Sequence, residues 1–513
     1  MDKKDYIVGI DIGSSNVAVA VGVRKENGEV SVLGVEVQEV EDCVKNGDIL
    51  NFLDLGKAIG VAKRALEEDL GLNLNSAYVG VSGKSVYCVR YEEYVDINSH
   101  TACVTENEIR ELTSRIDMVV PGGGDEIIAR MPLRYRIDDH QTVKNPIGAF
   151  GRKLSATYLF VLVGKQQVDL VNRAMHAAGL RVSGLCVNPT ILPQLLLNEN
   201  EMNEGAMIVD IGGDLTDISI VQEGKLWYFS SLPIGASSIN NDLREFLRIP
   251  KKDIDLLKRR YGAAVAENVA ADIAVPVKTT GHAKKQILQR NIAEIAEERL
   301  KDIAGFIMRE LKASKLSATI PCGVILTGGS AYLADIEELL SREMNMEVRL
   351  GHTLNGLDDE SQEKVVAFPQ SVVLGLLLYG AQHEACETSS INKDESTKSD
   401  NGRQGWEETP TDNQNEDKPL QNPQDVEKEP ISENPAENPT GESIESPTKP
   451  QPENPTEQDG QTSPKEKEDG EDTEQKPEEK GPEKGPKREP KESFMERIRK
   501  AIDGIFNSDD QYL

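Results

Sequence analysis

The chain has 513 residues and a formal net charge of -30 at pH 7. So acidic a chain repels a phosphate backbone, which excludes nucleic acid as an expected partner. Its six cysteines fall singly, without metal-type or paired spacing, so we expect a reducing compartment and no disulfide scaffold. No apolar run approaches the length of a membrane-spanning helix, and the apolar segment near the N-terminus is too short for a signal sequence.

The start of the chain predicts a mixed α/β sheet. Short apolar runs alternate with polar turns, and one longer segment has helical periodicity. Several strands combined with a crossover helix are typical of an α/β fold. We expect strands at 6–12, 17–23, 30–40 and 77–81, and a helix around 55–66.

The opening pattern recurs near residue 206. The sequence IVDIG at 208–212 echoes VGIDIG at 8–13, and each copy is followed by a small polar turn and a second apolar strand. The repeat predicts two related halves of one fold. We expect a first lobe at 1–84 and 164–200, an inserted subdomain at 85–163, and a second lobe at 201–383 with a helical subdomain at about 241–313.

The first polar turn begins at Asp11 and has the chemistry of a phosphate site. Its glycine lets backbone N–H groups approach phosphate oxygens, and its aspartate can hold Mg²⁺ through water. A single copy could equally be an ordinary β-hairpin. The second copy begins at Asp210, and two facing hairpins could grip phosphates and metal from opposite sides. The candidate residues are Asp11 and Asp210 for metal, and Gly13, Ser14, Ser15, Asn16, Gly212, Gly213, Asp214 and Thr216 for the cofactor.

A third element is the strand at 324–327 that runs into Gly328, Gly329 and Ser330. Consecutive glycines after a strand are often only a turn, but bare backbone can also receive a purine ring or a phosphate. The motif follows the other two at the distance that two lobes and an insertion require. We therefore add these three residues to the expected nucleotide site.

These three motifs, their order and their spacing resemble the superfamily of actin, sugar kinases and chaperone ATPases. The fuller resemblance, over most of residues 5–383, is to bacterial cell-division proteins of the FtsA family. It is carried by the insertion at 85–163, the segment NPIGAFGRKL at 145–154 and LTGGSA at 326–331. The resemblance implies an actin-like two-lobed fold with an insertion of the 1C type, and ATP with Mg²⁺ between the lobes.

The resemblance also implies partners. FtsA-like proteins assemble into actin-like filaments, work with other divisome proteins, and bind the C-terminal tail of FtsZ through the smaller subdomain of the second lobe. Here that subdomain is about 241–313. In it, Asp255 and Lys258 stand where related proteins have an acid and a lysine near the ribose and adenine, although a plain amphipathic helix explains them equally well.

Two residues depart from the FtsA pattern. Asn16 stands where lysine is usual, and Asp214 replaces the third glycine of a Gly-Gly-Gly run. The first change removes a positive partner for phosphate. The second adds a carboxylate that could either repel phosphate or orient water or metal. No independent catalytic base stands out, so the catalytic residues are unassigned and at most weak ATPase activity is expected.

The last part of the chain should leave the fold. Residues 384–492 are acidic and proline-rich, repeat Glu-Asn-Pro units, and predict a disordered linker. Residues 493–507 then predict a short amphipathic helix that lies in a membrane interface, as FtsA-like proteins have, or docks on protein instead. Its expected membrane-facing residues are Phe494, Met495, Ile498, Ile502, Ile505 and Phe506.

Together these features predict an ATP-binding protein that tethers FtsZ filaments to the inner face of the cytoplasmic membrane at the division site. One helix of this size should bind lipid weakly, so self-association would supply avidity. Two alternatives remain. A pilus-assembly actin homologue of the PilM type shares the insertion but normally lacks the linker and terminal helix, and a small-metabolite phosphotransferase would need a carboxylate base at a substrate pocket.

Overall fold

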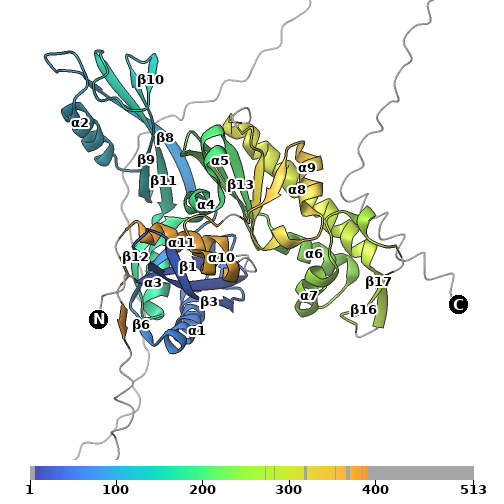
Figure 1. The fold of residues 1–513 in the computed structure, drawn as a ribbon. Helices are drawn as coiled ribbons and strands as arrows, with labels where there is room; N and C mark the ends of the chain where they lie inside the picture. The colour runs from blue at the N-terminus through green and yellow to red at the C-terminus, as the bar shows by residue number, and fades with distance from the viewer. Residues whose placement is uncertain are drawn as a thin grey trace, which may run out of the picture. The chain divides into compact units, whose positions relative to one another are not determined.

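The computed structural model describes residues 6–390, apart from 272, 282–283, 317–319, 353, 366–369, 384 and 387 (Figure 1). The terminal helix predicted at 493–507 and most of the predicted linker therefore lie outside the described residues. Within the described part of the chain, no helix is both long enough and apolar enough to cross a membrane.

The first lobe is built on a five-stranded sheet of order β12-β7-β1-β2-β3. Strands β1, β2 and β3 are antiparallel neighbours, whereas β7 and β12 run parallel to β1. Helix α1 packs against β3 and α3, and α11 packs against β1. The strands are β1 (Tyr6–Ile12), β2 (Asn16–Arg24), β3 (Val30–Glu39), β7 (Ser76–Val81) and β12 (Arg181–Val187), and the helices are α1 (Phe52–Leu70), α3 (Lys165–Ala177), α4 (Asn188–Leu196), α10 (Asp359–Val365) and α11 (Ser371–Ala381).

The second lobe repeats this design in a sheet of order β15-β14-β13-β18-β19. Three antiparallel strands are again followed by two strands parallel to the first, so β13, β14, β15, β18 and β19 correspond to β1, β2, β3, β7 and β12. The sequence repeat is thus a structural repeat. The elements are α5 (Glu199–Glu204), β13 (Ala206–Ile211), β14 (Thr216–Gln222), β15 (Lys225–Leu232), β18 (Val324–Thr327), the 3₁₀ turn η3 (Gly329–Tyr332), α9 (Ile336–Met344) and β19 (Val348–Leu350).

Between β7 and α3 of the first lobe, the chain forms a four-stranded antiparallel sheet of order β10-β9-β11-β8 that carries one helix, α2 (Figure 1). The sheet and helix share a small core of their own that includes Leu112, Ile116 and Leu154. Thr105 and Glu108 close the helix N-terminus with a capping box. The elements are β8 (Val86–Asp96), α2 (Glu106–Asp117), β9 (Asp125–Ile137), β10 (Gln141–Val143) and β11 (Lys153–Gly164).

The stretch expected to be helical holds three helices and also a hairpin. Strands β16 and β17 pair in an antiparallel ladder that the helical pattern did not indicate. The long helix α8 buries Ile292, Ile295, Ile303 and Ile307, which recur at helical spacing. The elements are α6 (Ala236–Leu247), α7 (Lys251–Tyr261), the 3₁₀ turn η1 (Ala266–Asn268), β16 (Ala274–Lys278), β17 (Lys284–Leu288) and α8 (Gln289–Ser314).

The fold continues past Glu384, where we expected the linker to begin. Cys386 is buried, and its backbone N–H donates to the carbonyl of Tyr6 at 2.8 Å. Strand β20 (Thr388–Ser390) then pairs antiparallel with β6 (Leu72–Leu74). Strands β20 and β6 form a two-stranded sheet of their own, so the first residues of the segment expected as linker pair with the first lobe.

Candidate functional site

The first two motifs form the same turn in each lobe. Gly13 donates its backbone N–H to the carbonyl of Asn16 at 3.0 Å, and Gly212 does the same to Leu215 at 2.9 Å. Each turn joins the first two strands of its sheet, so Asp11 and Asp210 occupy matching positions one residue before the end of β1 and of β13. The repeat seen in sequence therefore places two equivalent carboxylates in the two lobes.

The three motifs meet. A side chain added at Gly213 would overlap the hydroxyl of Ser15, so the turn of the second lobe lies directly against the turn of the first. A side chain added at Gly328 would overlap the Oδ1 of Asp210, and this glycine has φ +88°, a conformation that L residues rarely adopt. Glycine is required at Gly328, because its backbone also lies against the backbone of Ile211, whereas at Gly213 the close neighbour is the Ser15 side chain.

The meeting point concentrates negative charge. Burial raises the pKa of Asp11 to about 7, although a hydrogen bond from Asn188 Nδ2 at 3.2 Å opposes the shift. Burial, together with the negative charges of Asp217 and Asp11, raises the pKa of Asp210 to about 8. Three carboxylates removed from water and held near one another are unstable as anions. As they lie, they do not form a ready group of three metal ligands among the described residues.

Asp217 is the third member of this cluster, and the sequence analysis gave it no role. It is buried on β14, where burial raises its pKa to about 6. Ser82 of the first lobe donates its hydroxyl to Asp217 Oδ1 at 2.6 Å, and Ser82 also contacts Ser231 Oγ at 2.9 Å. An acidic residue in an otherwise apolar strand was the signal that could have identified it.

The other predicted residues have different surroundings. The Thr216 hydroxyl is committed inside the fold, donating to the carbonyl of Ile234 at 2.8 Å. Ser330 is buried, and its Oγ has no hydrogen-bond partner among the described residues. The neighbouring Gly329 faces open space, since a side chain added there would meet no atom within 4 Å. A buried Ser330 hydroxyl without a hydrogen-bond partner, next to the uncovered backbone of Gly329, suits a polar group of a ligand at this turn.

Asp255 and Lys258 pair with each other on α7. Lys258 Nζ lies 3.3 Å from Asp255 Oδ1, and Arg259 Nε lies 2.6 Å from Oδ2 of the same carboxylate. Burial lowers the pKa of Lys258, against the pull of Asp255. This geometry suits an amphipathic helix and a ligand-facing pair equally, so it does not choose between the two interpretations.

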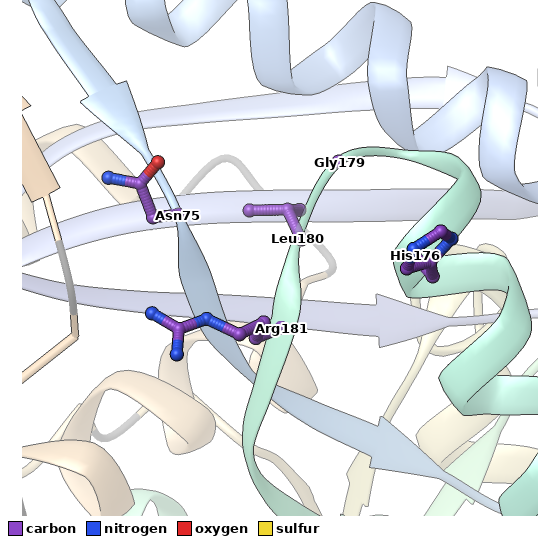
Figure 2. A pocket seen from close by; sticks show the side chains of 5 residues that line it. All are labelled: Asn75, His176, Gly179, Leu180 and Arg181. Atoms are coloured by element: carbon purple, nitrogen blue, oxygen red, sulfur yellow. The ribbon is translucent and has the colours of Figure 1, made fainter.

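A separate hollow lies in the first lobe, away from the motifs (Figure 2). Its volume is about 410 Å³, and the connection between α3 and β12 forms part of its lining. The lining residues are Asn75, His176, Gly179, Leu180 and Arg181. None of them belongs to the predicted site, and we assign the hollow no role.

Two related lobes with a phosphate-type turn in each define the class of protein as actin-like. The PilM-PilN type IV pilus biogenesis complex shares this fold, with a TM-score of 0.52 at 15% identity over 73% of this chain and 98% of that chain. The model described as cell division protein FtsA matches residues 207–371, and that of the SHS2 domain inserted in FtsA matches residues 83–162. Over these two segments the chain is similar to the FtsA family.

Curated relatives agree with this placement. The cell division protein FtsA of Pseudomonas aeruginosa is 28% identical over 74% of this chain and 90% of its own length. The FtsA of Escherichia coli K12 is 26% identical over 76% of this chain and 94% of its own length. That of Bacillus subtilis is 25% identical over 68% and 79%. These sequence matches favour the FtsA family over the PilM-type alternative, with which the chain shares the fold.

Proposed function

We propose that this chain binds ATP with Mg²⁺ where its two repeated turns meet. The observation that carries the proposal is the convergence of three glycine-bearing motifs, from both lobes, around the carboxylates of Asp11 and Asp210. Backbone N–H groups of the turns at Gly13 and Gly212 would hold phosphate oxygens. Mg²⁺ would neutralise phosphate charge and satisfy the two aspartates, directly or through water.

The remaining predicted residues complete this site. Ser14, Ser15 and Asn16 would line the phosphates from the first lobe, and Gly329 with the orphaned Ser330 hydroxyl would receive the nucleotide from the second. Asp255 and Lys258 would lie near the ribose and adenine. Asp217 would support the metal shell, since Ser82 already fixes its carboxylate.

We further propose the role of an FtsA-type tether. Nucleotide-dependent self-association would gather many copies, each joining the tail of FtsZ to the cytoplasmic membrane at the division site. The similarity of the chain to FtsA proteins supports this role. The residues proposed to enter the lipid interface, Phe494 to Phe506, lie outside the described part of the chain, so their support is the sequence pattern.

Titration of a fluorescent ATP analogue tests the nucleotide site. The wild-type chain should bind with a Mg²⁺-dependent affinity, and chelation with EDTA should weaken binding. Asp11→Asn should bind more weakly in Mg²⁺ and respond less to EDTA, because it has lost one proposed metal partner. Binding by wild type that EDTA does not change would contradict the metal assignment, and ADP release that required a small metabolite would favour the phosphotransferase alternative.

Co-sedimentation with anionic liposomes tests the tether. The intact chain should pellet with the vesicles, more strongly with ATP, whereas a chain ending before Ser493 should stay in the supernatant. If neither chain pellets under assembly conditions, the terminal segment docks on protein and the membrane part of the proposal fails.

A further inference from the structure

A small hairpin of the first lobe reaches the phosphate turn of the second. It consists of β4 (Val44–Lys45) and β5 (Asp48–Ile49), joined by Asn46 and Gly47. Both joining residues have positive φ, +50° and +81°, as a two-residue turn of type I′ requires. Asn-Gly is a favoured sequence for this turn, so the local sequence itself dictates the shape of the hairpin tip.

The tip is fixed firmly to the first lobe. The buried Gln167 donates from Nε2 to the carbonyl of Gly47 at 2.7 Å, and its Oε1 accepts the Ile49 N–H at 3.4 Å. Gly47 also packs so closely on the backbone at Ser82 that no side chain would fit. Lys84 adds an ion pair of 2.7 Å with Asp48. The backbone at the tip is therefore held in one position.

The rigid tip presents one backbone N–H to the second lobe. That of Asn46 donates to Oδ2 of Asp214 at 3.3 Å, across 168 positions of sequence. Asp214 lies in the turn between β13 and β14, beside the glycines assigned to phosphate. A carboxylate is a strong acceptor for a backbone N–H, and at this position a glycine would supply none. One of the two residues that depart from the FtsA pattern therefore bridges the lobes.

We propose that Asp214 is a positioning residue that latches the two lobes together and slows the release of bound nucleotide. The inference rests on the proposed ATP site. Ser82 and Asp217 join the same two lobes at 2.6 Å deeper in the site, and the Asn46–Asp214 contact adds a second point of closure. Opening the lobes to release nucleotide would break both.

The test is the rate at which a fluorescent ADP analogue leaves the protein when excess unlabelled ADP is added. Asp214→Ala removes the acceptor and should release the analogue roughly threefold to tenfold faster than wild type. Asp214→Asn keeps a carbonyl oxygen that can accept the Asn46 N–H and should release it at nearly the wild-type rate. The exposed Asp169→Ala on α3 controls for the loss of one negative charge.

A repulsive role for Asp214 predicts the opposite change in the release rate of the analogue. If the Asp214 charge mainly repels phosphate, both Asp214→Ala and Asp214→Asn will release the analogue more slowly than wild type, and the latch is refuted. Unchanged release from Asp214→Ala also refutes it. A wild-type chain without saturable analogue binding refutes the ATP site itself. If Asp214→Ala melts much below wild type, Asp214→Gly, which also lacks the acceptor, takes its place in the comparison.

Discussion

Replacing Asp210 by asparagine should stabilise the nucleotide-free and metal-free protein at pH 8. Asp210 contributes one of three clustered carboxylates, and the charges of Asp217 and Asp11 add to the effect of burial on its pKa. Asparagine has nearly the same shape and keeps the close approach to Gly328, but it carries no charge. The substitution therefore removes repulsion while leaving the packing of the site in place.

The size of the effect follows from the pKa. The carboxyl of Asp210 rises from 3.8 when unfolded to about 8 in the folded protein, so the unfolded state gains by ionising between those values. At pH 8 this linkage sets an upper bound of about 5 kcal/mol, at about 1.4 kcal/mol per pH unit. Partial access of solvent to Asp210 reduces this bound. We therefore expect Asp210→Asn to raise the free energy of unfolding by about 2 kcal/mol, which corresponds to a rise in melting temperature of roughly 2–6 °C.

The pH dependence shows whether the Asp210 carboxyl stabilises or destabilises the fold. Below about pH 4 the Asp210 carboxyl is protonated in both the folded and the unfolded state, so it does not destabilise the fold. Its destabilising effect grows as the pH rises from 4 to 8 and is complete above the pKa of the folded protein. Melting of wild type and Asp210→Asn in EDTA should therefore diverge between pH 5 and pH 8, while Asp169→Asn follows wild type. A melting difference that is zero or negative at pH 8 would show that the carboxylates are hydrated and separate.

Two further predictions concern stability elsewhere in the chain. Arg299 donates to Asp242 through Nε at 2.6 Å and Nη2 at 2.9 Å. Arg299→Ala should therefore lower the free energy of unfolding in urea by about 2–3 kcal/mol, because it leaves the buried carboxylate of Asp242 unpaired, and Arg299→Lys should lower it less. Leu112 is 1% exposed in the core of the inserted sheet, so Leu112→Ala should cost about 2–4 kcal/mol by opening a cavity, and an equal melting curve for the variant would contradict that packing.

The sheets of both lobes could be predicted because their signals are local and repeated. The continuous apolar run at 6–12 gives β1, and the same pattern at 208–212 falls on β13. Helix α11 (Ser371–Ala381) has a local signal of the same kind, because its sequence is apolar along almost its whole length and the helix is buried. The repeated order of strand, turn and strand then fixes which elements correspond between the lobes.

Elements that are defined by backbone pairing could not be predicted. Strands β16 and β17 are five residues each, too short for their alternation to compete with the helical pattern around them. Strand β20 lies in a polar segment, and it forms because β6 offers a free edge. In both cases the backbone pairing, and not side-chain periodicity, defines the strand.

The residues of the candidate site also fall into two groups, those that local sequence predicts and those that it does not. Asp11 and Asp210 were found because each follows an apolar strand and precedes a glycine turn, a pattern visible within a few residues. The part played by Asp217 depends on Ser82, which lies 135 positions earlier in the other lobe. Asn188, which donates to Asp11, was missed for the same reason. Local sequence identifies the groups that carry charge, but not the groups that hold them in place.

The interpretation of Asp214 needs both the local sequence and the contacts seen in the structure. From sequence, its carboxylate had only the phosphates to act on, so repulsion or water orientation were the available interpretations. The structure adds the Asn46 N–H, a partner that the fixed hairpin of the other lobe supplies. Mg²⁺ and water would screen a carboxylate's repulsion of phosphate, whereas its hydrogen bond lasts for as long as the lobes stay closed. An acid in this turn therefore favours the closed form over the open one, which a third glycine could not do.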